Sequence, residues 1–468
     1  MERRDPTTTV RGLCQRVGEQ FDALPDRALK RVEVALFGVV VSAVVVAGYL
    51  QGRLQLVFPI PSVLGGDAVT MLQATMACLT LSGLFGISAV VLLGQLRGDG
   101  VPQFPVTGPT VTAVVPVHED AAVLHRSVES LLDSHYRDIE VVIVAEPGDE
   151  ASIERGRSLA SHDRVELLVN DEYPGTKAGA INYAAEATTS DLFAVFDADE
   201  RVDEQFVSAA VGRIEENDAD VVQGRTIPEP DGLVGVVAYY ESVVLGDLSQ
   251  RLLTVVTDFT VAASRTVVMT RSAFETADGY DPEMLTEDYA FAFDCYQSGL
   301  DVVEQFAYAS TIEAAHTVRD WWGQRKRWMT GYVQVLHHLL GRSVGRLVGD
   351  TGRLVGDTGS HPHRDLLSPV ICASSVFGNL FMLSLVSKAA VLVSYGQGRW
   401  LTIPAFTLIG AAVTLRAYDT ICGRLDSVGV GYLLLPAVLP LYSLAGIKAL
   451  VEYLFTWDGE WYSVTKGQ

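Results

Sequence analysis

The chain has 468 residues, enough for two or three structural units. Its 57 acidic residues outnumber 35 basic ones, for a formal net charge of −22. This acidic balance leaves no basic stripe to neutralise phosphates, so it argues against nucleic acid as a partner. Lysine is rare, and an acidic, lysine-poor surface stays hydrated in concentrated salt, which predicts a halophilic source. The five cysteines form no CxxC pair, so neither a zinc site nor a disulfide framework is predicted.

The N-terminal region combines a basic tail with two long apolar runs. We expect residues 1–32 to form a cytoplasmic tail and residues 33–97 to form two transmembrane helices, over residues 34–50 and 68–96. A spanning helix needs about 20 mostly apolar residues, and neither run shows polar positions at helical spacing. The tail holds seven basic residues and the loop between the runs only Arg53. The positive-inside rule therefore places the tail and the following domain in the cytoplasm.

The middle of the chain, residues 110–340, has the pattern of an α/β domain. Apolar runs rich in β-branched residues at 111–117, 139–145, 164–169 and 192–196 predict strands, and helical spacing at 121–133 predicts a helix between the first two. Strands that alternate with helices indicate a largely parallel sheet. Ligands of such sheets bind beyond the carboxyl ends of the strands. Those ends carry residues 116–119 (PVHE), Glu146 and the Asp197-Ala198-Asp199 element.

Asp197 and Asp199 form an Asp-x-Asp element whose position gives it meaning. In a chain this acidic the pattern alone arises often by chance, but here it follows a buried strand, where carboxylates need a cation or a donor. Two carboxylates in that position suit Mg²⁺ or Mn²⁺ bridging a diphosphate. Upstream, residues 176–182 (TKAGAIN) supply Lys177 and a close backbone approach at Gly179, a combination that suits anionic phosphates.

Five short motifs occur in a fixed order: PVHE, TKAGAIN, FDADE, TED and QRKRW. This order resembles membrane-bound family-2 glycosyltransferases, a group that includes cellulose, chitin and hyaluronan synthases and ceramide glucosyltransferase-like enzymes. The resemblance covers about residues 110–335, and the flanking apolar runs fit the same layout. It implies a GT-A nucleotide-diphospho-sugar transferase domain flanked by transmembrane α-helices. It also implies an inverting, metal-dependent hexosyltransferase that uses Mg²⁺ or Mn²⁺.

The resemblance also implies roles for particular residues. Asp197 and Asp199 would hold the metal, and Asp288 of the TED motif, beside Glu287, would be the general base that deprotonates the acceptor hydroxyl. Trp328 would offer an aromatic face to the acceptor sugar. The nucleotide sugar would be bound by Pro116, Val117, Glu119, Glu146, Lys177, Gly179, Asp197, Gln324, Arg325 and Arg327.

Glu146 and the pair Trp321 and Trp322 each lead to a further expectation. Glu146 stands where related enzymes usually carry an Asp pair that contacts the base and ribose; a glutamate accepts the same hydrogen bonds through a longer side chain. Trp321 and Trp322 precede the QRKRW motif, and we expect both to anchor an interfacial helix at the membrane boundary, where tryptophan is favoured.

The C-terminal region returns to apolar runs. Residues 341–365 contain GRLVGDT twice in succession, at 345–351 and 352–358, and we expect them to form a linker. Residues 366–456 are expected to hold about three transmembrane helices, over 366–395, 401–417 and 428–455, before a tail at 457–468. Together these features predict a multi-pass protein of the cell membrane with a cytoplasmic catalytic domain.

The motifs leave the acceptor open. One hypothesis is a processive synthase that moves a sugar, with a UDP-sugar as the expected donor, onto a growing polysaccharide at the membrane. The other is a single sugar transfer to a lipid or polyprenyl-type carrier. A third hypothesis, a membrane sensor with a degenerate nucleotide-binding domain, conflicts with the intact Asp199, Asp288 and Arg327.

Overall fold

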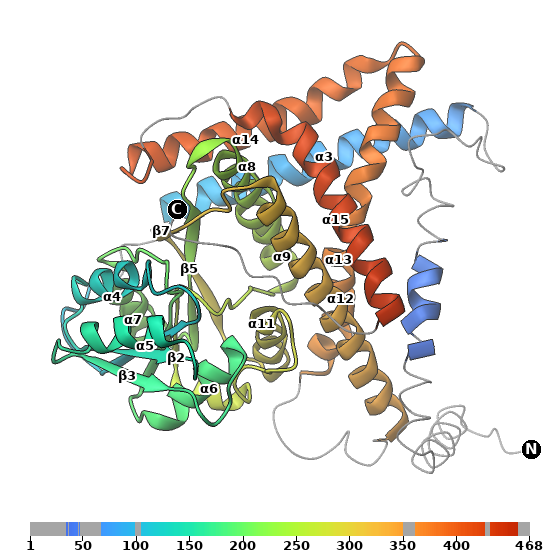
Figure 1. Ribbon diagram of the computed structural model, residues 1–468. Helices are drawn as coiled ribbons and strands as arrows, with labels where there is room; N and C mark the ends of the chain where they lie inside the picture. The colour runs from blue at the N-terminus through green and yellow to red at the C-terminus, as the bar shows by residue number, and fades with distance from the viewer. Residues whose placement is uncertain are drawn as a thin grey trace, which may run out of the picture.

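The protein combines an α/β domain with a group of long apolar helices, as a computed structural model shows (Figure 1). The structure describes residues 34–46 except 36 and 45, then 67–98, 104–349, 361–425 and 431–456. The predicted tails at 1–32 and 457–468, the end of the first predicted span and the second GRLVGDT copy lie outside the described residues.

A seven-stranded mixed sheet forms the centre of the α/β domain, in the order β3-β2-β1-β4-β6-β5-β7. Only β6 runs antiparallel to its neighbours, β4 and β5. The four strands predicted from sequence are confirmed as β1 to β4, and the last three strands were not predicted. The strands are β1 (Val111–Val117), β2 (Ile139–Ala145), β3 (Val165–Val169), β4 (Leu192–Val195), β5 (Val221–Pro228), β6 (Val267–Thr270) and β7 (Val302–Ile312).

Helices cover both faces of the sheet, which explains why its strands read as continuous apolar runs. Val115 and its alternate neighbours pack in a core with α4 (Leu124–Leu132), α5 (Glu150–Leu159) and α7 (Phe206–Asn217). Val114 faces the opposite way, into a second core with α6 (Lys177–Ala187), α10 (Arg271–Thr276) and α11 (Glu287–Ser298). That second core continues into the long apolar helices, so the two parts of the molecule share buried side chains.

The long helices lie in two directions. Figure 1 shows α3 (Asp67–Gly98) and α14 (Thr402–Ile421) side by side, running across the direction of the other three. Those three are α12 (Val318–Gly349), α13 (Pro362–Ser394) and α15 (Leu435–Thr456), which pack against one another. Because α12 continues to Gly349, the predicted domain end at residue 340 and the start of the predicted linker at 341 fall inside a helix.

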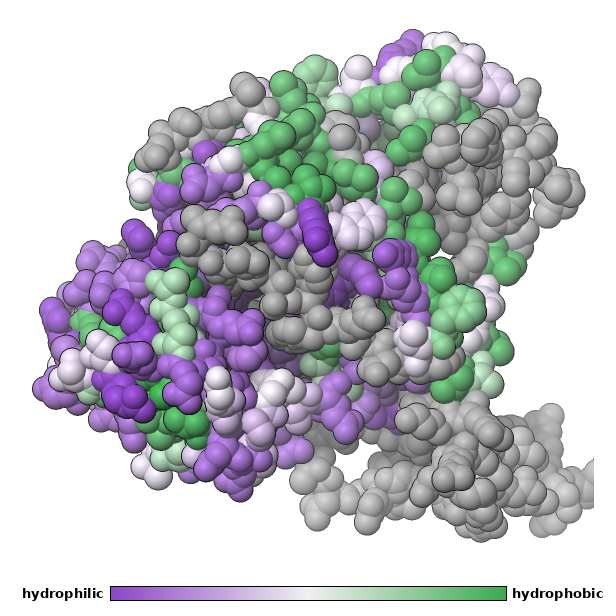
Figure 2. Space-filling view, viewed as in Figure 1, coloured by the Kyte–Doolittle hydropathy of each residue, from purple (hydrophilic) through white to green (hydrophobic). Residues whose placement is uncertain are grey.

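Four helical stretches among the described residues are long and apolar enough to cross a membrane. Three fall on predicted spans: Met71–Val91, Gly398–Ile421 and Val438–Thr456. The predicted span at 366–395 is also helical, within α13. Apolar surface gathers over these helices and hydrophilic surface over the α/β domain, as Figure 2 shows. The layout is compatible with a membrane protein.

The fourth stretch, Gly232–Thr257, was not predicted. It consists of α8 (Gly232–Glu241), a π-helical turn η1 (Ser242–Leu248) and α9 (Ser249–Thr257). Each of its charged side chains meets an oppositely charged residue elsewhere: Glu241 with Arg325, Asp247 with Arg225, and Arg251 with Glu304. These pairs join the middle of the stretch, from Glu241 to Arg251, to the α/β domain and α12.

A buried ion-pair cluster joins this stretch to α14. The Arg225 guanidinium on β5 contacts the Asp247 carboxylate at 2.7 Å and donates to both oxygens of Asp419. The Tyr239 hydroxyl donates to the same Asp419 carboxylate at 2.7 Å. Arg225 and Asp419 are buried, so each charge depends on the other for its stabilisation.

We predict that Asp419→Asn destabilises the protein by roughly 3 kcal/mol, because it leaves Arg225 with only part of its compensating charge. Thermal unfolding in detergent measures the effect as a lower Tm. The control is Asp294→Asn on α11, whose partner Arg342 is 40% exposed; it should cost roughly 1 kcal/mol or less. Equal shifts for the two variants would contradict the role given to the cluster.

Candidate active site

A cavity of about 420 Å³ lies beyond the carboxyl ends of β1 and β4. It collects charged groups from segments far apart in the sequence. Of the predicted site residues, only Gly179 and Arg325 do not line it. The lining includes Pro116, Val117, Glu119, Glu146, Lys177, Asp197, Asp199, Arg265, Glu287, Asp288, Glu313, Gln324, Arg327 and Trp328.

The end of β4 places two carboxylates beside two cations. Asp197 Oδ1 is 2.5 Å from Lys177 Nζ, which is carried by the first residue of α6, and Asp197 Oδ2 is 4.0 Å from Arg265 Nη1. Asp199 is nearly buried, and its Oδ2 accepts the Glu313 N–H at 3.3 Å. The structure thus brings Asp197, Asp199 and Lys177 together as the sequence predicted.

Glu200 is a site residue to which the sequence analysis gave no role. Its carboxylate is completely buried behind the cavity, where it accepts the Asp197 N–H at 3.0 Å and the hydroxyl of Thr266. Burial raises the pKa of Glu200 to about 7, and the charge of Asp197 adds to the rise. The residue follows the Asp-x-Asp element directly, so its position in FDADE was the available signal.

Glu146 organises the loop that follows β3. Its carboxylate accepts the Asn170 side-chain amide at 3.0 Å and the Gly175 N–H at 2.7 Å. The longer side chain of glutamate is therefore used to reach this loop while still facing the cavity. Asn170 belongs to none of the five motifs, so no sequence pattern marked it.

Gly179 serves the same loop and not the cavity, which differs from the predicted nucleotide contact. A β-carbon at this position would lie 2.2 Å from the Tyr173 carbonyl oxygen, so only glycine permits the close approach. Its N–H is bound by the Thr176 hydroxyl, which caps the N-terminus of α6 and so fixes the helix that carries Lys177.

Glu287 and Asp288 occupy the first turn of α11, where acidic residues suit the helix dipole. The Glu287 carboxylate is buried and accepts the Ser264 hydroxyl at 2.8 Å. Burial raises the pKa of Glu287, and the neighbouring charge of Asp288 raises it further. Asp288 is half-buried, and its Oδ1 accepts the Tyr289 N–H at 2.8 Å while the side chain lines the cavity. Of the two acids, Asp288 is the accessible one.

Two arginines, Arg265 and Arg327, line the cavity together with these carboxylates. Burial lowers the pKa of Arg265, but the charges of Asp197 and Asp288 outweigh this and leave it raised. Burial lowers the pKa of Arg327 despite the opposing charges of Glu287 and Asp288. Arg265 was missed because it belongs to none of the five motifs; only its position before β6 brings it to the cavity.

The QRKRW motif lies on α12 and is divided between two faces of that helix. Gln324, Arg327 and Trp328 line the cavity, three and four residues apart on one face. Arg325 is turned away by one residue, and its Nε donates to Glu241 at 2.6 Å. Arg325 was predicted to contact the nucleotide sugar, but its side chain points to Glu241 and away from the cavity.

The expectation for Trp321 was also wrong. Its ring is buried instead of lying at a membrane boundary, and Nε1 donates to Glu241 at 2.7 Å. The carboxylate partner lies 80 residues earlier in the chain, so no local pattern revealed it.

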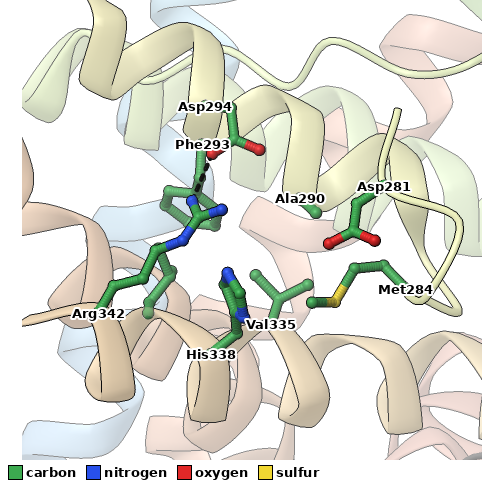
Figure 3. A pocket seen from close by; sticks show the side chains of 9 residues that line it. Asp281, Met284, Ala290, Phe293, Asp294, Val335, His338 and Arg342 are labelled. Carbon is green, nitrogen blue, oxygen red and sulfur yellow. Dashed lines mark hydrogen bonds and ion pairs between the residues drawn. The ribbon is translucent and has the colours of Figure 1, made fainter. Parts of the chain in front are cut away.

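A second, much smaller cavity lies between α11 and α12 (Figure 3). Its volume of about 10 Å³ holds one water molecule at most. Figure 3 shows Arg342 reaching across it to Asp294, at 2.6 Å. This space is too small for a substrate, so we assign no ligand to it.

Glu200 allows a prediction about pH. In the folded protein the Glu200 carboxyl group keeps its proton up to about pH 7, whereas in the unfolded chain it releases the proton near its ordinary pKa of 4.5. The unfolded state therefore binds fewer protons in this interval, and the stability contributed by protonated Glu200 is lost as pH rises from about 4.5 to about 7. The full change is on the order of 3 kcal/mol.

The variant Glu200→Gln has no carboxyl group to titrate at this position, so it does not lose this contribution as pH rises. The Tm of the variant minus the Tm of the unmodified protein should therefore be larger at about pH 8 than at about pH 5. Thermal unfolding in EDTA measures this at both pH values. Glu216→Gln, an exposed acid on α7, is the control and should follow the unmodified protein. Parallel pH curves for Glu200→Gln and the unmodified protein would contradict the assignment.

Comparison with known families supports the resemblance in the motifs. Residues 112–266 match the family described as Glycosyl transferase family 2, and residues 192–415 match Glycosyl transferase family group 2. The two matches overlap across β4, β5 and the Asp-x-Asp element, and together they include every lining residue named above.

Three curated proteins are similar in sequence, all of them glycosyltransferases by name, and two of them illustrate the range. Glycosyltransferase GlyG of Streptococcus pneumoniae serotype 4 (strain ATCC BAA-334 / TIGR4) is 27% identical over 124 residues, 26% of this chain and 41% of GlyG. Probable glycosyltransferase YdaM of Bacillus subtilis (strain 168) is 21% identical over 243 residues, 50% of this chain and 58% of YdaM. The chain thus aligns with less than two thirds of either relative.

A solved structure shares the fold. The mannosyltransferase PcManGT from Pyrobaculum calidifontis, in complex with GDP-Man and Mn²⁺, superposes with a TM-score of 0.52 at 17% identity. The superposition covers 82% of this chain and 99% of PcManGT. The matched families, the sequence relatives and the shared fold together support a family-2 glycosyltransferase built on a GT-A fold.

Proposed function

We propose that the protein transfers a sugar from a nucleotide-sugar donor to an acceptor at the membrane, with inversion at the anomeric carbon. The observation that carries the proposal is the cavity itself, whose lining combines the accessible carboxylate of Asp288 with Lys177 and Arg265 beside Asp197. One carboxylate is then available to accept a proton, while other groups of the same cavity carry the charges that suit a diphosphate.

A divalent cation fits the carboxylates at the end of β4. Asp197 and Asp199 offer carboxylate oxygens, the ligands that Mg²⁺ and Mn²⁺ favour. Among the described residues, no group of three or more His, Cys, Asp and Glu side chains is arranged to hold a metal ion. Two protein carboxylates suit a cation whose other ligands are substrate phosphates and water. Such a cation, when bound, would neutralise the charge of the leaving diphosphate.

The chain's own residues supply the remaining chemistry. Asp288 would take the proton of the acceptor hydroxyl as that oxygen forms its bond to the anomeric carbon. The bond between the anomeric carbon and the diphosphate oxygen breaks in the same step, and the nucleoside diphosphate leaves. Arg265, Arg327 and Lys177 would hold its oxygens, since guanidinium groups and ammonium groups both bind phosphate. Glu287, buried against Ser264, would keep Asp288 in place.

The donor is proposed to be a UDP-sugar, and GDP-mannose is the alternative that the bound ligand of PcManGT raises. The acceptor is proposed to be a growing polysaccharide, with Trp328 facing its terminal sugar. The alternative acceptor is a lipid or polyprenyl-type carrier. One observation favours that alternative: the α/β domain shares its hydrophobic core with α13 and α15. An acceptor held in the membrane beside these helices would therefore lie close to the cavity.

The experiment is to incubate the purified protein, in high salt and detergent, with Mn²⁺ and a panel of UDP-sugars and GDP-mannose, together with extracted membrane lipids. Nucleotide release and product size are measured. A long polymer supports the synthase, and a single sugar on a lipid supports the carrier glycosyltransferase. If no donor in the panel releases nucleotide above the level of Asp288→Asn, the proposed function is wrong.

We predict that Asp288→Asn lowers the transfer rate by at least about 100-fold, because the amide cannot accept the acceptor's proton. Donor affinity, measured by titration calorimetry with Mn²⁺, should change by less than about threefold, since the arginines and Lys177 remain. Asp294→Asn, on the same helix but facing Arg342, is the matched control and should keep both values. Loss of donor affinity in a folded Asp288→Asn protein would contradict a base role.

A further inference from the structure

The α8–α12 cluster consists of Glu241, Trp321, Arg325 and Trp328. Glu241 is the last residue of α8 and is 2% exposed. Its two oxygens have different donors: Oε1 accepts Arg325 Nε at 2.6 Å, and Oε2 accepts Trp321 Nε1 at 2.7 Å. A buried carboxylate with two directional donors has a fixed position, because any rotation would leave a buried charge without its hydrogen bonds.

Arg325, which Glu241 holds in place, contacts two side chains that line the cavity. Its guanidinium lies 4.3 Å from the centre of the Trp328 ring and 5.7 Å from that of Trp321, and its Nη1 donates to the Gln324 side chain. Gln324 and Trp328 line the cavity, whereas Arg325 itself is 3% exposed and does not. One buried guanidinium therefore contacts two of the cavity-lining side chains of α12.

The spacing along α12 explains how this is possible. Trp321, Arg325 and Trp328 are separated by four and three residues, so they stack along one face of the helix toward α8. Gln324 and Arg327 share the neighbouring face toward the cavity. Trp328 lies where the two faces meet, with one side of its ring on Arg325. A flat guanidinium suits this stacking, and an ammonium group does not.

From these contacts we infer that Glu241 is a positioning residue for the acceptor site: through Arg325 it sets the orientation of the Trp328 ring on which the acceptor sugar stacks. The inference rests on the proposed function. Glu241 lies outside all five sequence motifs and does not line the cavity. Its main effect is on acceptor binding, because the donor groups Asp197, Lys177 and Arg265 lie on other elements; among the residues predicted to bind the donor, Gln324 accepts a hydrogen bond from Arg325.

The test uses Glu241→Gln in the full chain, which keeps the side chain's shape and removes its charge. The matched control is Glu304→Gln, which removes the carboxylate that pairs with the buried Arg251 at 2.7 Å; Glu304 does not line the cavity. Both proteins carry 5-fluorotryptophan, and the Trp328 fluorine signal is assigned with Trp328→Phe. Octyl β-glucoside, below its micelle concentration, serves as the sugar probe.

In the unmodified protein the Trp328 signal should shift on addition of octyl β-glucoside. Glu241→Gln should move this signal in the free protein and raise the octyl β-glucoside concentration for half of the shift by about tenfold. The KM of the donor, measured from its slow hydrolysis by water, should stay within about twofold of its value in the unmodified protein. Glu304→Gln should leave all three quantities unchanged.

Several outcomes overturn the inference: an unchanged Trp328 signal in Glu241→Gln, an equal effect in Glu304→Gln, or no response of Trp328 to the probe in the unmodified protein. If Glu241→Gln does not fold, Arg325→Lys makes the same test, because it keeps the charge and loses the flat stacking surface. Failure of the proposed function is a separate result, since it appears as absent nucleotide release while the fluorine signals still report on the α8–α12 cluster.

Discussion

The packing of α12 between the α/β domain and the apolar helices is the interaction on which the site depends. One face of this helix carries Gln324, Arg327 and Trp328 into the cavity, and its other faces contact α8, α11, α13 and α15. The Lys326 ammonium pairs with Glu452 of α15 at 2.5 Å, within the QRKRW motif itself. The cavity therefore has one wall fixed to the sheet and one wall fixed to the helices, and neither part alone completes it.

Charge pairing between distant segments holds that arrangement. Arg225 joins β5 to η1 and α14, and Arg325 joins α12 to the end of α8. Buried ion pairs add little net stability compared with apolar contacts, but an unpaired buried charge is costly. Each pair therefore acts mainly against alternative placements, because a helix that slid by one turn would leave a charge buried without its partner.

The parts of the structure that could be predicted from sequence are those with local patterns. β1 to β4 were recognisable because buried parallel strands form unbroken apolar runs, and the motif order brought Asp197, Asp199, Lys177 and Asp288 to one expected site. β5 to β7 were not predicted. Their order in the sheet, with β6 antiparallel between β4 and β5, depends on tertiary contacts that no local pattern records.

The residues that were missed have partners far away in the chain. Glu241 meets Arg325 after 84 residues, and Arg225 meets Asp419 after 194. Hydropathy alone also says little about Gly232–Thr257, a stretch of spanning length that contacts α3, α14 and α15 and whose three charges all face partners. Arg325 lies within a motif, yet the direction of its side chain could not be predicted either, because it depends on which face of α12 packs against α8.

The charge of the cavity restricts the ligands that it can bind. Its lining has eight acidic residues against Lys177, Arg265 and Arg327, so the site as a whole is acidic. Several of the acids are engaged by the protein: Glu146 binds the loop after β3, Glu287 binds Ser264, and Glu313 pairs with Arg126. The lining also includes Asp197, which pairs with Lys177, together with Asp199 and Asp288, and we propose that these three carboxylates lie near the diphosphate of the donor. A dianionic ligand is repelled by such a group unless a cation enters with it. The acidity of the lining is therefore the reason why we propose that a metal ion enters the donor site with the nucleotide sugar.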